Sequence, residues 1–79
     1  MNNRRTLKTI GKKLHAERKD AGLTMAQLAA DSGVSKGNLS KIEHGSDFQI
    51  STLYKLCKAL GTRPRYVLPD FKLSNESPF

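Results

Sequence analysis

Residues 23–45, LTMAQLAADSGVSKGNLSKIEHG, have the pattern of two short amphipathic helices joined by a tight turn. Thr24 is a favourable N-cap, and Gln27 stands three residues later, as a capping box requires. Gly33 follows an Asp-Ser pair and suits the left-handed backbone found at helix ends. Ser35 can cap a second helix. The stretch therefore predicts a helix-turn-helix.

The two predicted helices have one apolar and one polar face. Ala29 stands where two steeply crossing helices need a small side chain. The residues expected to share a core are Leu28, Val34, Leu39 and Ile42. The outer face of the second helix carries small, polar or cationic residues, which suit a DNA major groove. These candidate DNA contacts are Ser35, Lys36, Gly37, Asn38, Ser40, Lys41 and His44. The alternative is an ordinary helical hairpin with a solvated face.

Composition restricts the class of protein. The chain has 79 residues and a net charge of +7, from 14 basic and 7 acidic residues. This excess favours a polyanionic partner, which is nucleic acid or, less often, a membrane surface. The sequence has no apolar run long enough to span a bilayer and no secretory signal. A single Cys excludes an internal disulfide and fits a reducing cytosol. We expect one small cytoplasmic domain, associated with the nucleoid through DNA.

The N-terminal part predicts a basic arm and a long helix. Residues 1–6 resemble a flexible arm in which Arg4 and Arg5 touch DNA phosphate or the minor groove. The alternative is a frayed, solvated terminus. A helix is expected over residues 7–21, with an apolar stripe of Leu7, Ile10 and Leu14.

Arg18 and Glu43 are a candidate structural ion pair. Arg18 follows Leu14 by four residues and should point at the edge of the core. Glu43 lies in the last turn of the second motif helix. An Arg can donate two parallel hydrogen bonds to a carboxylate, so we expect a partly buried pair that fixes the first helix against this one. Two independent surface charges are the alternative.

The C-terminal third predicts two more helices and a tail. Phe48 and Ile50 are expected to fill a gap beside the second motif helix, and Ser51 to cap the next helix. The buried stripe of that helix should be Leu53, Leu56, Cys57 and Leu60. A short fifth helix is expected over residues 63–68, capped by Thr62, with its side chains Tyr66, Val67 and Leu68 covering the fourth.

The tail offers candidate dimer contacts. Residues 69–79 lack periodicity, and most of this segment is expected to be flexible. Its apolar residues can fold back on the core or bury against a second copy. The candidate dimer surface is the region of the fourth and fifth predicted helices, and its candidate residues are Tyr66, Leu68 and Phe71.

Catalytic and metal-binding patterns are absent from the sequence. His15 and His44 have no Cys or carboxylate neighbours at metal spacing. No Gly-rich phosphate loop follows a predicted strand. We therefore expect neither an enzyme nor a cofactor.

Residues 10–68 resemble the Cro/cI-like helix-turn-helix domain, also called the XRE family. The matching signatures are IGKKLHAERKDAGLT, LAADSGVSKGNLSKIEHG and STLYKLCKALG. The resemblance implies an all-α bundle of five helices, of the lambda-repressor-like type. It also implies operator binding as a homodimer and regulation of transcription, most often repression, in bacteria and their phages.

Two positions depart from the family pattern. The family often has a base-reading side chain where this chain has Gly37. It commonly has a phosphate-binding Gln where Met25 follows Thr24, so only the helix N-terminus remains to hold phosphate there. We therefore expect fewer side chains that contact base edges directly, and a larger contribution of DNA shape to specificity. The alternative function is a protein-interaction adaptor, or an antitoxin-type partner-binding protein, with the same fold.

Overall fold

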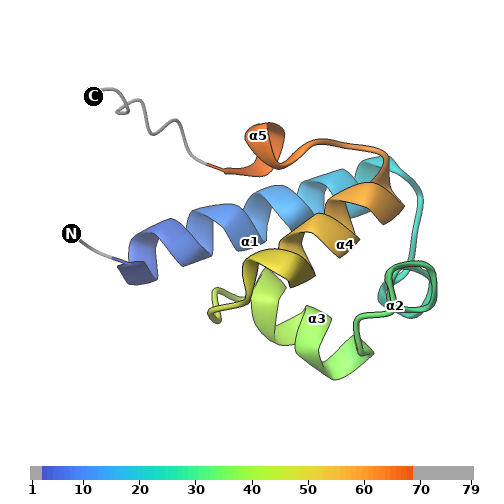
Figure 1. Cartoon of the computed structure of the whole chain (residues 1–79), viewed down its shortest axis with the longest axis horizontal. Coiled ribbons are helices and arrows are strands. Elements are labelled where there is room, and N and C mark those ends of the chain that lie inside the picture. The colour runs from blue at the N-terminus through green and yellow to red at the C-terminus, as the bar shows by residue number, and fades with distance from the viewer. Residues whose placement is uncertain (1–2, 69–79) are drawn as a thin grey trace.

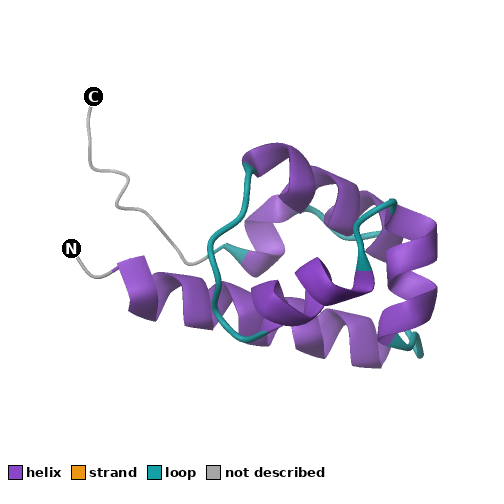
Figure 2. Ribbon diagram, turned by 90° about the horizontal axis from the view of Figure 1, so that it is seen from below, coloured by secondary structure: helices purple, strands orange, loops and turns teal. Residues whose placement is uncertain are grey.

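The computed structural model describes residues 3–68, which form five α-helices and no strand (Figure 1). Their bounds are α1 Asn3–Asp20, α2 Met25–Ser32, α3 Lys36–Glu43, α4 Ile50–Leu60 and α5 Pro64–Val67. The predicted all-α bundle of five helices is confirmed. α3 and α5 lie on opposite sides of α1 and α4, as the two perpendicular views show (Figures 1 and 2).

The core is formed where the apolar stripes of all five helices meet. Its buried side chains are Ile10, Leu14, Leu28, Val34, Leu39, Ile42, Leu53, Leu56, Cys57 and Val67. Cys57 is 1% exposed. Burial, together with the negative charge of Glu17, raises the pKa of its thiol. The thiol is therefore protonated near neutral pH and packs as a small hydrophobic group, as predicted.

Three helices, α1, α4 and α5, begin at other residues than predicted. α1 begins at Asn3 and not at Leu7, so residues 3–6 of the predicted arm are helical. This segment contains no Gly or Pro, and Arg is a good helix former. α4 begins at Ile50, and its N-cap is Gln49, whose carbonyl accepts the first helical hydrogen bonds without a side-chain cap.

Thr62 was predicted to cap α5, but Arg63 is its N-cap. The Thr62 N–H donates to the carbonyl of Cys57 at 2.9 Å, which closes the C-terminal turn of α4. Pro64 is the first helical residue of α5, where its missing N–H costs no hydrogen bond.

Two expected core contacts were wrong. The Ile50 side chain is 62% exposed, because Ile50 is the first residue of α4 and not part of an inward-folding loop. Tyr66 is 59% exposed, since neighbouring residues of a helix point about 100° apart and Val67 takes the inward position. Phe48 and Leu68 are partly buried against the core.

Candidate nucleic-acid interface

α2 begins with a complete capping box. The Thr24 hydroxyl accepts from the Gln27 N–H at 3.1 Å, and the Gln27 side chain accepts from the Thr24 N–H at 2.8 Å. This geometry fixes the first turn of α2. The backbone N–H groups of Met25 and Ala26 have no helical partner by position, and they form the positive end of the helix.

The turn between α2 and α3 is held by backbone geometry and a second cap. Gly33 has φ 80°, in the left-handed region, and its N–H donates to the carbonyl of Ala29 at 2.9 Å. Ser35 is the N-cap of α3, and its hydroxyl accepts from the Asn38 N–H at 3.1 Å. Both features were predicted from the sequence. Together they fix the start of α3 relative to α2.

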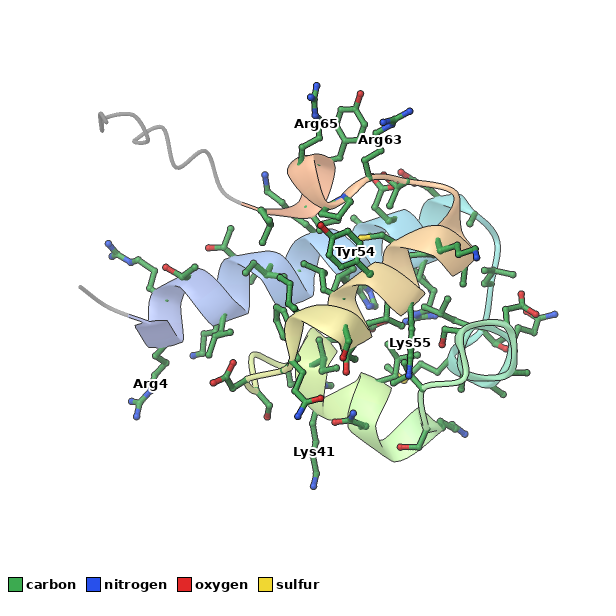
Figure 3. The ribbon with its side chains drawn as sticks, in the orientation of Figure 1. Arg4, Lys41, Tyr54, Lys55, Arg63 and Arg65 are labelled. Atoms are coloured by element: carbon green, nitrogen blue, oxygen red, sulfur yellow. The ribbon has the colours of Figure 1, made fainter. Side chains whose placement is uncertain are left out.

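The outer face of α3 is exposed. Leu39, Ile42 and Glu43 are buried, whereas the opposite side of the helix faces solvent. Its exposed residues are Lys36, Gly37, Asn38, Lys41 and His44, with Ser40 partly buried. Lys41 projects away from α4 and α5 (Figure 3). A Cβ at Gly37 would have no atom within 4 Å. The face is therefore an open, cationic and largely polar surface.

His44 ends α3 and its ring is fixed by the helix. Nδ1 lies 2.7 Å from the carbonyl oxygen of Ser40. Because a carbonyl only accepts, Nδ1 carries the hydrogen in this contact. The other ring nitrogen, Nε2, is then the atom left for an outside partner.

A buried network joins α1 to α3. Arg18 donates to Glu43 through Nε to Oε2 at 2.8 Å and through Nη2 to Oε1 at 3.1 Å. It also donates through Nη1 to the carbonyl of Leu23 at 2.9 Å. Arg18 is 6% exposed and Glu43 8%. The structure thus brings these two predicted partners together with the expected fork geometry, in a more buried position than expected.

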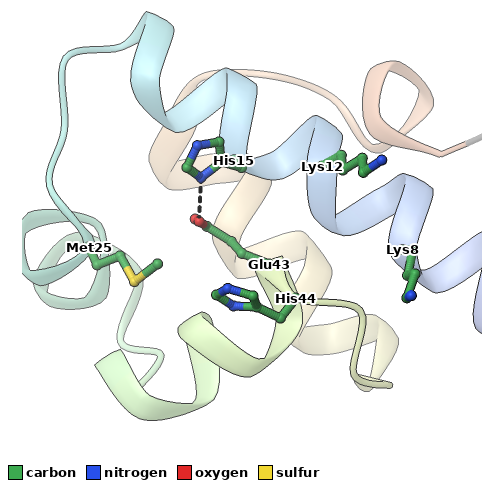
Figure 4. A pocket seen from close by; sticks show the side chains of 6 residues that line it. All are labelled: Lys8, Lys12, His15, Met25, Glu43 and His44. Atoms are coloured by element: carbon green, nitrogen blue, oxygen red, sulfur yellow. Dashed lines mark hydrogen bonds and ion pairs between the residues drawn. The ribbon is translucent and has the colours of Figure 1, made fainter.

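His15 is a third member of this network that the sequence did not reveal. Its Nδ1 lies 2.9 Å from Glu43 Oε1 (Figure 4). Burial raises the pKa of the Glu43 carboxyl, but hydrogen bonds from Arg18 and His15 outweigh it, so the pKa lies below its usual range. The hydrogen bond to Glu43 raises the pKa of Arg18. Glu43 is therefore an anion whose charge is satisfied inside the molecule.

Gly11 is a second residue that sequence reasoning missed. A Cβ there would lie 2.5 Å from the carbonyl oxygen of Ile42 and 2.7 Å from that of Glu43. Only glycine lets the α1 backbone approach the last turn of α3 so closely. A glycine inside a helical apolar stripe, next to Ile10, was the available signal.

The other candidate residues are distributed over the surface. The apolar side chain of Met25 packs partly buried against the core, so it offers no hydrogen bond to a phosphate. Arg4 and Arg5 are exposed in the first turns of α1. Tyr66 and Leu68 lie at α5, on the side of the bundle away from α3, and Phe71 lies outside the described residues.

Residues 3–68 contain neither a cluster of metal-ligating side chains nor a membrane-spanning helix. No three His, Cys, Asp or Glu side chains come together there as a metal site. No helix in that range is long and apolar enough to cross a membrane.

The comparisons with known proteins agree with this geometry. A family model described as helix-turn-helix matches residues 14–67, which is more than half of the chain. The matched segment contains α2, the turn and α3, and it includes Arg18 and Glu43. The search of curated proteins gave no match. The chain belongs to the XRE-type helix-turn-helix family of DNA-binding transcriptional regulators.

Proposed function

We propose that this protein binds double-stranded DNA in a sequence-specific manner, with α3 in the major groove, and acts as a homodimeric repressor at a palindromic operator. The observation that carries the proposal is the exposed face of α3. Lys36 and Lys41 are exposed on that face, while the N-caps Thr24 and Ser35 fix the first turns of α2 and α3. A pre-positioned helix with an open cationic face suits base-edge recognition.

Each contact residue has a separate role in the proposal. Lys36 and Lys41 donate to guanine O6 and N7 or to nearby phosphates. Asn38 contacts the backbone at the flank, and Ser40 lies beside the base edges. The free N–H groups at the start of α2, next to Thr24, hold a phosphate.

Gly37 contributes space and not a donor. Because nothing lies within 4 Å of its Cβ position, the DNA can approach the α3 backbone closely there. When few side chains of a recognition helix contact base edges, sequence specificity depends more on the shape and deformability of the DNA.

A homodimer is proposed because the described residues leave large apolar side chains in solvent. These are Ile50, Tyr54 and Tyr66, with exposures of 62%, 59% and 59%. Ile50 and Tyr54 are four residues apart and share one face of α4. Partly buried Leu68 belongs to the proposed surface. Phe71, which lies outside the described residues, stays a candidate from the sequence. Dimers of this type bind half-sites about 34 Å apart, so a palindrome is expected.

Selection of bound sequences from a random duplex pool, repeated at two salt concentrations, tests the proposal. The expected result is an enriched palindrome whose affinity exceeds that of random DNA at both salt concentrations. Binding without a motif that disappears as salt rises would contradict sequence-specific recognition, because only charge would be acting. A protein partner would then be the better hypothesis.

Lysine variants assign the recognition to α3. Lys36→Ala and Lys41→Ala should each cost about 1–3 kcal/mol on the selected duplex if the lysine reads a base. Lys58→Ala is the matched control, since Lys58 is exposed on α4 and belongs to neither helix of the motif. Equal losses for all three variants would contradict the assignment.

A further inference from the structure

A row of cations on α1 has no partner of opposite charge among residues 3–68. Arg4, Lys8 and Lys12 follow one another at four-residue intervals and therefore lie on one face of the helix. All three side chains are exposed. Within residues 3–68 none of them forms an ion pair with a carboxylate. We call this row the α1 ridge.

The ridge is unfavourable for the helix that carries it. Like charges four residues apart repel each other. The first turn of α1 also contains no acidic residue, although the positive end of the helix favours one. An external anion along the ridge would relieve both effects.

Two hollows lie along the ridge, and the larger of them reaches the helix-turn-helix. The larger, of about 460 Å³, lies between α1, the start of α2 and the end of α3 (Figure 4). Its lining residues are Lys8, Lys12, His15, Met25, Glu43 and His44. The smaller, of about 330 Å³, is lined by Arg4, Arg5, Lys8, Thr9 and Lys12. Because Lys8 and Lys12 line both, the hollows form one continuous cationic surface.

Glu43 is the single acidic side chain in the two linings. Its carboxylate already accepts hydrogen bonds from Arg18 and His15. It is 8% exposed. The surface therefore offers an incoming anion several cations and no free negative charge.

The ridge lies beside α3 and on the same side of the molecule as its outer face. Arg4 and Lys41 both project away from α4 and α5 in Figure 3. A Cβ at Gly45, just after α3, would lie 2.8 Å from Lys8 Cγ. DNA that occupies the outer face of α3 thus has the ridge next to it.

We propose that the α1 ridge is a second DNA-binding surface, which contacts the phosphate backbone of the duplex beside the groove that α3 enters. This inference rests on the proposed function. Successive ridge residues are separated by about 6 Å along the helix axis, so the ridge can follow a backbone over several contacts. It adds affinity without sequence preference, because phosphate contacts position a protein and do not read bases.

The test removes two ridge charges and compares salt dependence. The double variant Lys8→Gln/Lys12→Gln keeps most of each side chain and removes the charge. Its matched control is Lys13→Gln/Lys58→Gln, which changes two exposed lysines that line neither hollow. Fluorescence anisotropy gives the Kd of each full-length variant for the selected duplex and a scrambled duplex, across a salt series. Thermal unfolding confirms that both variants fold.

The binding constant of the ridge variant should fall less steeply as salt rises. Its slope of log K against log salt should be less negative by about 2, since each phosphate contact contributes about −0.9. Its affinity at low salt should fall by the same factor for both duplexes, while the control retains the wild-type slope. A ridge variant with the slope of the control would overturn the proposal. A loss confined to the selected duplex would overturn it as well, because the ridge would then read bases.

These outcomes are distinct from failure of the proposed function. If the wild-type chain showed no preference for any duplex, sequence-specific binding would fail and the ridge proposal would fall with it. If the wild type prefers the selected duplex and the ridge variant matches the control, only the ridge proposal fails.

Discussion

At the scale of single residues, Arg18 has the most demanding environment in the motif. It is buried and donates to both oxygens of Glu43 and to the carbonyl of Leu23. Removing either charge leaves the other buried with too few partners, and this costs more than the pair contributes in net stability. The pair therefore fixes how α1 meets α3.

Arg18→Met is expected to lower the free energy of unfolding by about 3–5 kcal/mol, because it leaves the Glu43 carboxylate buried with only His15. The double variant Arg18→Met/Glu43→Leu should recover much of this loss, since it removes both buried charges. Urea denaturation of the wild type and the variants measures the difference. A single variant within 1 kcal/mol of the wild type would mean that water reaches the carboxylate.

Glu43 also predicts a pH dependence of stability. Its pKa is lower in the folded chain than in the unfolded one, because the hydrogen bonds from Arg18 and His15 outweigh burial. The ionised carboxylate therefore stabilises the fold fully at pH values above the pKa that this carboxyl has in the unfolded chain. This stabilisation is lost as pH falls through the lower, folded pKa.

Thermal melting between pH 2.5 and 7 measures this effect. The wild-type Tm should fall on the acid side of this range. The Glu43→Gln variant has no carboxyl at this position. Its Tm should be lower than that of the wild type at neutral pH and should fall less as the pH decreases. Parallel curves for the two proteins would assign the acid sensitivity to other carboxyl groups.

At the scale of helices, two glycines with opposite surroundings give a matched pair of variants. Gly11 lies where α1 contacts the carbonyls of Ile42 and Glu43, whereas Gly37 lies on the open face of α3. Gly11→Ala should destabilise the fold by about 1–3 kcal/mol, since backbone atoms must move. Gly37→Ala should stabilise it by up to about 1 kcal/mol through helix propensity.

Denaturation midpoints of the two variants distinguish these effects. The substitution is the same, so a difference in sign can come only from the local environment. If Gly11→Ala were neutral, the contact between α1 and α3 would be looser than the structure indicates. If Gly37→Ala were destabilising, the start of α3 would depend on something other than helix propensity.

The elements that the sequence predicted well are those with local signals. Thr24 with Gln27, and Gly33 followed by Ser35, are capping patterns whose partners lie within four residues. The contact of His15 with Glu43 spans 28 residues, and no periodicity reports it. The same limit applies to Gly11, whose role depends on a helix that lies far along the chain.

Boundaries were less predictable than the elements themselves. α1 begins before Leu7 because the basic residues that suggested an arm are also good helix formers. Ile50 was expected inside because apolar residues in loops often are, but the earlier start of α4 leaves it at an open helix end. The candidate DNA contacts of α3 were predicted because they do not belong to its apolar stripe. Helical spacing alone therefore sufficed to predict that they share one face.

At the scale of the whole molecule, the proposed DNA-binding surfaces and the proposed dimer surface lie on different helices. The outer face of α3 and the α1 ridge carry cations, and they lie on one side. The large exposed apolar side chains lie on α4 and α5, together with the exposed cations Lys55, Lys58, Arg63 and Arg65. Under the proposed function, one chain can contact DNA and a second copy at the same time, because the two surfaces lie on different helices.

Ile50→Lys is expected to weaken self-association, because it places a charge on the proposed dimer surface of α4. Sedimentation velocity should show a dimer for the wild type and a monomer for the variant at equal concentration. Ala21→Lys, at an exposed position after α1, adds the same charge elsewhere and should remain dimeric. The wild-type Tm should also rise with protein concentration, since association stabilises the folded state, whereas the Tm of Ile50→Lys should not.

The same variant connects assembly to recognition. On a duplex with two half-sites, Ile50→Lys should bind more weakly than the wild type, because its two copies bind independently. On a duplex with one half-site the two proteins should differ far less, since α3 is unchanged. If Ile50→Lys stayed dimeric and bound both duplexes like the wild type, the dimer surface would lie elsewhere. The exposed face of α4 that contains Tyr54 would then be left without a proposed partner.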